Sequence, residues 1–80
     1  MDFDCTLHRR IARLSSDGYW GKELNLISWR GHPPKYDVRS WTSDHAKMGK
    51  GVALSKCEAI ALRDALTALN LGETQYNKGE

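Results

Sequence analysis

The 80-residue sequence has few of the residues that build covalent or metal-based frameworks. Its two cysteines, Cys5 and Cys57, allow at most one disulfide, and there is no CxxC motif. The three histidines, His8, His32 and His45, lack zinc-ligand spacing with each other or with the cysteines. We therefore expect no metal site, no cofactor, solvent-exposed histidines and a reducing intracellular compartment.

Long hydrophobic runs and targeting signals are also absent. No stretch approaches the roughly 20 apolar residues that span a bilayer. The N-terminus has no basic region followed by an apolar run, as a signal peptide would. These absences predict a cytoplasmic protein with no membrane partner.

Catalytic patterns are missing as well. The phosphate-binding motif GxxxxGK[ST] is absent, and there is no nucleophile elbow or oriented carboxylate pair. Asp44, His45 and Cys57 can be drawn as a catalytic set. However, Cys57 falls in an apolar helical row, where a buried structural thiol is the simpler interpretation. We expect that the protein is not an enzyme.

What the sequence does contain is a central segment of alternating character, residues 34–41 (PKYDVRSW). In an extended strand, Lys35, Arg39 and Trp41 share one face with Asp37, while the other face carries apolar residues. Cations beside an indole favour a polyanion with flat groups, of which single-stranded nucleic acid is the common example. Two other uses stay open: the charges can solubilise an exposed face, and the indoles can be core or dimer-contact residues.

The distribution of charge supports a basic sheet. Residues 18–56 contain seven Lys or Arg and three acids, whereas the flanks contain five bases and seven acids, within a total net charge of +2. A chain this short buries only about 60% of its unfolded surface, so a monomer would be marginally stable. Both observations fit a small domain that dimerises and binds a polyanion.

The hydrophobic pattern predicts an α+β fold, in which four antiparallel strands precede one C-terminal helix. We expect strands over residues 5–14, 22–29, 34–41 and 52–54, with a polar loop over 42–48. A bulge is expected at Arg9-Arg10, placing Leu7 and the later apolar residues on one face. In the second strand we expect Leu24 and Leu26 to face the core and Trp29 to face outward, although Ile27 favours the opposite arrangement.

A capping box of Ser55 and Glu58 predicts a helix from Lys56 to about Leu69, ended by Asn70 or Gly72. Its apolar stripe is wide, which favours burial against both the sheet and a second copy's helix, although a helix half sunk in its own sheet fits equally. The domain is then residues 1–71, followed by a flexible polar tail over 72–80. The residues expected at the dimer interface are Leu62, Ala65, Leu66 and Leu69.

Three sequence blocks resemble the bacterial branch of the transcriptional positive cofactor four family. The eukaryotic coactivator domain of that family shares a strand like Asp37-Val38-Arg39 followed by an aromatic. It also shares a Gly-Lys-Gly-(Ile/Val)-x-Leu strand that runs into the helix. The matching blocks cover most of residues 14–69 and comprise 18–29 (GYWGKELNLISW), 34–41 (PKYDVRSW) and 45–55 (HAKMGKGVALS).

The resemblance implies a curved-sheet homodimer that binds single-stranded DNA with little sequence preference, and a role as a transcriptional coactivator or in protecting unpaired DNA. It implies that bases stack on two tryptophans and that phosphates meet three lysines and an arginine. These residues are Trp29 and Trp41, and Lys22, Lys35, Arg39 and Lys50. Trp20 matches only the bacterial branch and receives no role. Two alternatives remain, namely RNA binding and a protein-interaction module that docks the transcription machinery.

Overall fold

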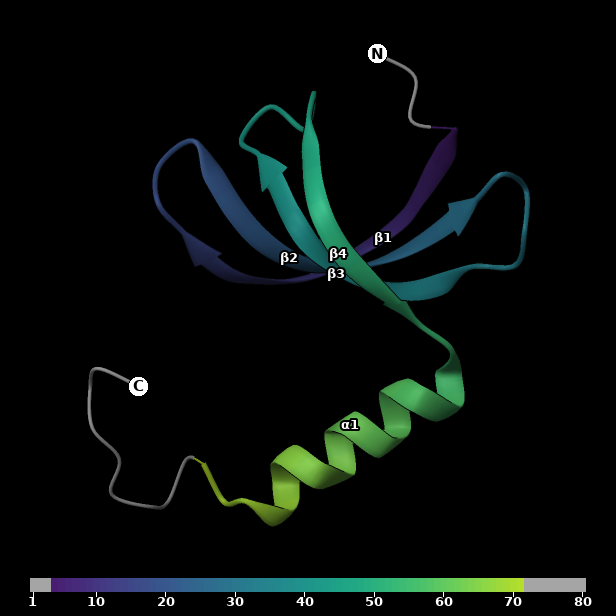
Figure 1. The fold of residues 1–80 in the computed structure, drawn as a ribbon, viewed down its shortest axis with the longest axis vertical. Coiled ribbons are helices and arrows are strands. Elements are labelled where there is room, and N and C mark those ends of the chain that lie inside the picture. The colour runs from purple at the N-terminus through teal and green to yellow at the C-terminus, as the bar shows by residue number, and fades with distance from the viewer. Residues whose placement is uncertain (1–3, 72–80) are drawn as a thin grey trace.

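The computed structural model describes residues 4–71 and shows a curved four-stranded antiparallel sheet followed by one helix (Figure 1). The strands are β1 (Cys5–Ser16), β2 (Trp20–Trp29), β3 (Lys35–Thr42) and β4 (Met48–Leu54), and they lie in the order β1-β2-β3-β4. The helix α1 spans Lys56–Ala68. The sheet with its C-terminal helix was therefore predicted correctly, while the predicted tail lies outside the described residues.

Local signals set the element boundaries where the sequence indicated. The Ser55 side chain accepts a hydrogen bond from the Glu58 amide at 3.2 Å, and the Glu58 carboxylate accepts one from the Ser55 amide at 2.8 Å. This confirms the capping box, which satisfies amides that a helix start otherwise leaves without partners. The predicted end is confirmed too, since Asn70 adopts a positive φ of 54° just after the helix.

The fourth strand is longer than the sequence indicated. Residues 48–51 belong to β4 and pair with β3, whereas Met48 was assigned to a loop and the strand was expected to begin at Val52. The pairing contains a register shift between Arg39 and Trp41, so Gly49 and Lys50 together lie opposite Ser40. Such a bulge absorbs an extra residue, and a pattern of alternating residues does not reveal it.

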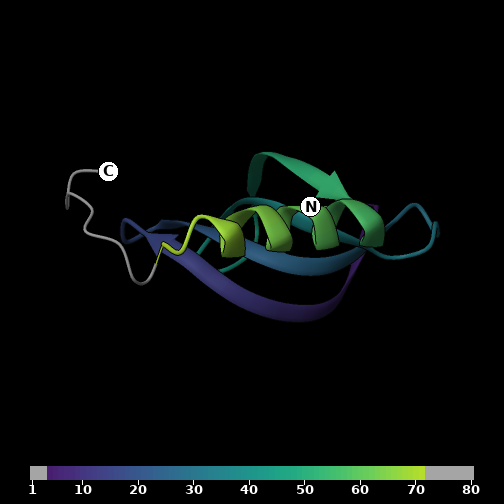
Figure 2. The ribbon, with the colours of Figure 1, turned by 90° about the horizontal axis from the view of Figure 1, so that it is seen from below.

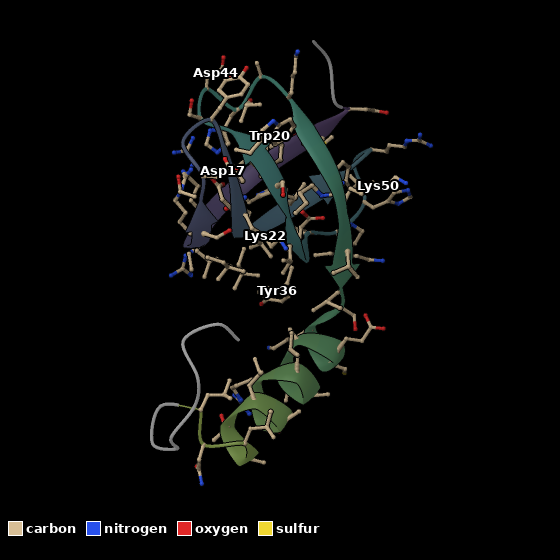
Figure 3. All side chains as sticks on the ribbon, turned by 60° about the vertical axis from the view of Figure 1, so that its left-hand side comes forward. Asp17, Trp20, Lys22, Tyr36, Asp44 and Lys50 are labelled. Carbon is tan, nitrogen blue, oxygen red and sulfur yellow. The ribbon has the colours of Figure 1, made fainter. Side chains whose placement is uncertain are left out.

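The sheet has two faces of different character. The side that faces α1, called here the helix side, carries the apolar residues Leu24, Leu26, Tyr36, Val38 and Leu54. Figures 1 and 2 show the helix lying beneath the convex side of the sheet, and Figure 3 shows Tyr36 pointing toward the helix. The expectation that Leu24 and Leu26 share a face with Tyr36 and Val38 is therefore confirmed.

The opposite, concave face holds most of the buried residues, which contradicts the expected arrangement. Ile27 and Asp37 are fully buried there, Asn25 is 1% exposed and Trp41 is 4% exposed. The sequence pattern predicts this face to be the solvated one. The reason is curvature: side chains on the inside of a strongly coiled sheet converge and cover one another, even without a second layer.

The helix makes little use of its own sheet. Among residues 4–71 it contacts β3 and β4, and it contains no buried residue. Its apolar side chains remain exposed, with Leu62 at 46% and Leu66 at 44%. Cys57, expected to be buried, is exposed as well. Within residues 4–71 the helix is thus neither sunk in the sheet nor covered on its other side.

Close backbone approach between β3 and β4 yields a first testable prediction. A Cβ at Gly51 would collide with the Arg39 side chain and the Val38 carbonyl oxygen, whereas one at Gly49 would meet the Ser40 Cβ at an ordinary 3.6 Å. We expect Gly51→Ala to destabilise the fold by about 1–3 kcal/mol, the usual cost of overpacking. Gly49→Ala, the matched control, should be neutral or slightly stabilising. Urea unfolding at equal protein concentration measures both, and equal midpoints would contradict the proposed close approach.

Candidate nucleic-acid interface

The centre of the concave face is a buried ion pair on β3. The Arg39 guanidinium donates two hydrogen bonds to the Asp37 carboxylate, from Nε to Oδ1 at 2.7 Å and from Nη2 to Oδ2 at 2.9 Å. The Asp37 side chain is completely buried and that of Arg39 is 15% exposed. Asp37 therefore holds Arg39 in one orientation.

The same guanidinium orders the first tryptophan. Its central carbon lies 4.8 Å from the centroid of the Trp29 ring, a cation–π contact. Trp29 stands at the end of β2, so the contact shows how strongly the sheet curves. The indole nitrogen of Trp29 is buried and has no hydrogen-bond partner among the described residues. Trp29 is therefore a half-buried ring fixed beside a cation.

A pocket opens beside this ring. It has a volume of about 340 Å³ and is lined by Trp29, His32, Pro33 and Lys35. That size lies within the range of about 300–1,000 Å³ that is usual for small-ligand pockets. Lys35 lies opposite Ile27, on the same face as Trp29, and is exposed. The structure thus brings three of the predicted residues together, namely Trp29, Lys35 and Arg39.

Trp41 lies on the predicted face but is covered. The imidazole of His45 stacks against its ring with centroids 5.4 Å apart and an angle of 36° between the planes. The expectation of an exposed Trp41 indole is therefore wrong for this structure. His45 was expected to be solvated, but its side chain is mostly buried. His45 itself adopts a left-handed backbone conformation, with φ of 58°.

His45 lies in the loop between β3 and β4 and is held in place by groups on β1 and β2. Its Nε2 lies 3.0 Å from Glu23 Oε1 and 3.1 Å from Oε2, and its Nδ1 lies 3.3 Å from Arg10 Nη2. Glu23 also accepts a hydrogen bond from the Asn25 amide at 3.1 Å and pairs with Arg13 at 3.5 Å. Three segments of the chain, β1, β2 and the loop between β3 and β4, therefore meet at one buried carboxylate.

Two predicted lysines lie apart from this cluster. Lys22 lies opposite Ser40, on the side of Leu24 and Val38, so its backbone position directs it away from Trp29. Lys50 is exposed on the edge strand β4, and it is labelled in Figure 3. Trp20 also lies on the side opposite Trp41, close to the backbone of Gly49.

Sequence reasoning overlooked Arg10, Arg13, Glu23 and Asn25 as parts of this surface. Their only signal is their type, since the strand register that gathers them depends on bulges in β1. Among residues 4–71, no group of three or more His, Cys, Asp or Glu side chains is arranged to hold a metal ion. No helix in that range is long and apolar enough to cross a bilayer.

A curved antiparallel sheet with clustered aromatic and cationic groups, followed by a helix, defines a small binding domain without a recognisable catalytic centre in its described part. Residues 17–65 match the family model described as Transcriptional Coactivator p15 (PC4). The chain belongs to this family, as its sequence resemblance indicated. An uncharacterized protein from Treponema pallidum (strain Nichols) is 48% identical over 71 residues, covering 88% of this chain and 84% of the relative. Membership points to a nucleic-acid-binding or coactivator-like role.

The Glu23 cluster yields a prediction of pH dependence. Burial alone would raise the pKa of Glu23, but hydrogen bonds from His45 and Asn25 outweigh it and lower that pKa below its ordinary value. A carboxyl with a lower pKa in the folded state stabilises the fold above its unfolded pKa, near 4.5. That contribution is lost as pH falls through the folded value.

We therefore expect the free energy of unfolding to fall as the pH drops below about 5, and to fall less in Glu23→Gln. Urea titrations at several pH values measure this dependence. The control is Asp64→Asn, because the Asp64 carboxylate is exposed and pairs with Arg63 on the helix surface. An acid dependence as steep in Glu23→Gln as in the unaltered protein would contradict the assignment.

Proposed function

We propose that the protein binds single-stranded DNA with little sequence preference, as a homodimer with a coactivator-like role. Support comes from the unit formed by Trp29, Arg39 and Asp37, in which a buried ion pair fixes a cation against an indole. Such a ring is ordered before binding, so a base that stacks on it loses little additional side-chain freedom. Stacking is worth about 1–3 kcal/mol per base and tolerates any sequence.

In this proposal Trp29 accepts a base in its pocket, and Lys35 at the pocket rim meets a neighbouring phosphate. Arg39 acts chiefly by orienting Trp29, because its charge is largely offset by Asp37. A base stacks on Trp41 only after His45 leaves its ring, so Trp41 contributes less than Trp29. Lys22 and Lys50 lie outside the central cluster and contribute long-range attraction to phosphates.

The decisive measurement is binding of a fluorescently labelled oligo-dT strand, followed by anisotropy. We expect the single strand to bind more tightly than its duplex. We expect Trp29→Ala to weaken binding by roughly 5- to 150-fold, which corresponds to one lost stacking contact. Tyr19→Ala is the control, since Tyr19 is 51% exposed and lies in the turn before β2. Preference for the duplex, or equal effects of both variants, would argue against the proposal, and RNA of the same sequence as competitor separates the two nucleic acids.

The dimer is proposed from the uncovered apolar surfaces. A groove of about 410 Å³ lies between the helix side of the sheet and α1, and its lining includes Leu24, Tyr36, Leu62 and Leu66. Leu69 is 60% exposed. Contiguous exposed apolar surface of this kind marks interaction sites. A second copy's helix would cover both the groove and the exposed apolar face of α1. It would pack through Leu62, Ala65, Leu66 and Leu69.

Light scattering tests this arrangement directly. We expect a dimer mass for the unaltered protein and a shift toward monomer for Leu66→Glu, because a charge at the interface would lose its hydration without a partner. Cys57→Glu places the same charge at an exposed helix position that does not line the groove and serves as the control. A monomer mass for the unaltered protein at micromolar concentration would exclude the dimer.

A further inference from the structure

Strand β1 contains irregularities that bring two arginines onto the concave face. Its pairing with β2 shifts between Leu7 and Arg9, between Arg10 and Ala12, and between Arg13 and Ser15. As a result Arg10 lies opposite Asn25 and Arg13 lies opposite Glu23. In a regular strand, residues three apart point to opposite faces. The middle bulge removes that difference, so both arginines lie on the face of Trp41.

The expected effect of the bulge on the apolar residues was wrong. Leu7 lies opposite Ile27 on the concave face, whereas Ala12 lies opposite Leu24 and Leu14 lines the groove under the helix. The bulges therefore do not gather the apolar residues of β1. What they gather on the concave face is a pair of cations.

Arg10 and Arg13 line a pocket of about 200 Å³ together with Ile11, Ala12, Glu23 and Asn25. The pocket floor is polar, since Glu23 is 5% exposed and Asn25 is 1% exposed. The Asn25 side chain donates to Glu23, and its Oδ1 is buried without a hydrogen-bond partner among the described residues. The pocket is thus a polar recess with cationic walls.

The guanidinium of Arg13 is positioned by its surroundings. It pairs with Glu23 at 3.5 Å and donates to Ser16 Oγ at 3.3 Å. It also passes over Gly21, where a Cβ would lie only 2.7 Å from the guanidinium carbon and 2.8 Å from the Ser15 carbonyl oxygen. A side chain at that position of β2 would therefore displace Arg13.

The charges in the pocket favour an anion. Two guanidinium groups face a single carboxylate among the lining residues, and that carboxylate is shared with His45. Each guanidinium has five N–H donors, of which the interactions above use only some. Both side chains are well exposed at the rim, that of Arg13 at 43%. Their planar donor groups suit the paired oxygens of a phosphate.

The recess also adjoins the tryptophan cluster. Arg10 lies 3.3 Å from His45, and His45 covers Trp41. The recess therefore lies on the same concave face as Trp29 and Trp41, beside the side chain that covers Trp41. We propose that Arg10 and Arg13 form a phosphodiester-binding subsite that extends the interface onto β1; this inference rests on the proposed function.

Neighbouring arginines of β1 provide a matched test. Arg9 lies opposite Leu26, on the helix side, so Arg9→Gln removes the same charge from the other face. We expect Arg10→Gln and Arg13→Gln each to reduce the log–log salt slope of oligo-dT binding by about 0.7, or roughly fivefold in affinity at 0.1 M salt. Arg9→Gln should leave the slope unchanged, and Arg10→Lys should restore most of it.

The outcomes separate this subsite from the proposed function. Absence of single-strand binding by the unaltered protein would overturn both. Normal binding with equal slopes in Arg9→Gln and Arg10→Gln would overturn the subsite alone. Since Arg13→Gln leaves Glu23 with one fewer cationic neighbour, thermal unfolding of each variant accompanies the titrations. If Arg13→Gln unfolds, the comparison of Arg10 with Arg9 decides the question by itself.

Discussion

The concave face depends on one buried carboxylate, that of Asp37. A fully buried charge is tolerated only when it is paired and hydrogen-bonded, and Arg39 supplies both through two parallel contacts. The pairing immobilises the guanidinium, which in turn holds the ring of Trp29. Arg39 therefore links the ion pair within β3 to Trp29 at the end of β2. Loss of Asp37 would remove both of its hydrogen bonds with Arg39, leave Arg39 with its 3.4 Å contact to the Gly49 carbonyl oxygen, and loosen the cation beside Trp29.

The two faces of the sheet differ in how their side chains are buried. Curvature lets the concave face bury side chains without a covering layer, at the cost of enclosing Glu23, Asn25 and Asp37, which are polar. The helix side remains apolar and only partly covered, because α1 stands over it without burying a residue. A single chain of this length therefore has a small core on one side and an unsatisfied apolar surface on the other. Association through the apolar side would leave the concave side available to a ligand.

The sequence predicted the alternating faces of β3 and the start of the helix correctly, but it did not predict which face of the sheet is buried. The parity of residues 35–41 placed Asp37, Arg39 and Trp41 on one face correctly, and Ser55 with Glu58 fixed the helix start. The sequence pattern left open which face would be enclosed, because that depends on how far the sheet coils. For the same reason it did not indicate that His45, distant in sequence from Glu23, would cover Trp41.

The bulges of β1 limited the prediction in a second way. A doublet of arginines suggested a change of register, yet the number of shifts and their effect depend on how β1 follows the curved edge of β2. An inserted residue inverts the face of everything beyond it, so an error of one position exchanges Arg9 for Arg10. Those two residues are chemically identical and adjacent, and only the register distinguishes them. Candidate cations on such a strand are therefore assigned from pairing rather than from composition.

Overlap between the core and the candidate interface shapes how the protein can be studied. Trp41, Asn25 and Asp37 contribute to both, so their replacement changes stability and the surface together. Lys35 does not share this ambiguity, because it is exposed at the rim of the Trp29 pocket. Arg10 shares less of it than the buried residues, since it is exposed and contacts this cluster through His45. A binding change on replacing a rim cation, with unfolding unaltered, therefore reports on the interface itself. Because of this overlap, the proposed ligand would also affect stability. A nucleic-acid strand bound in the concavity would cover the side chains that hold the sheet together, and would stabilise the folded state by mass action.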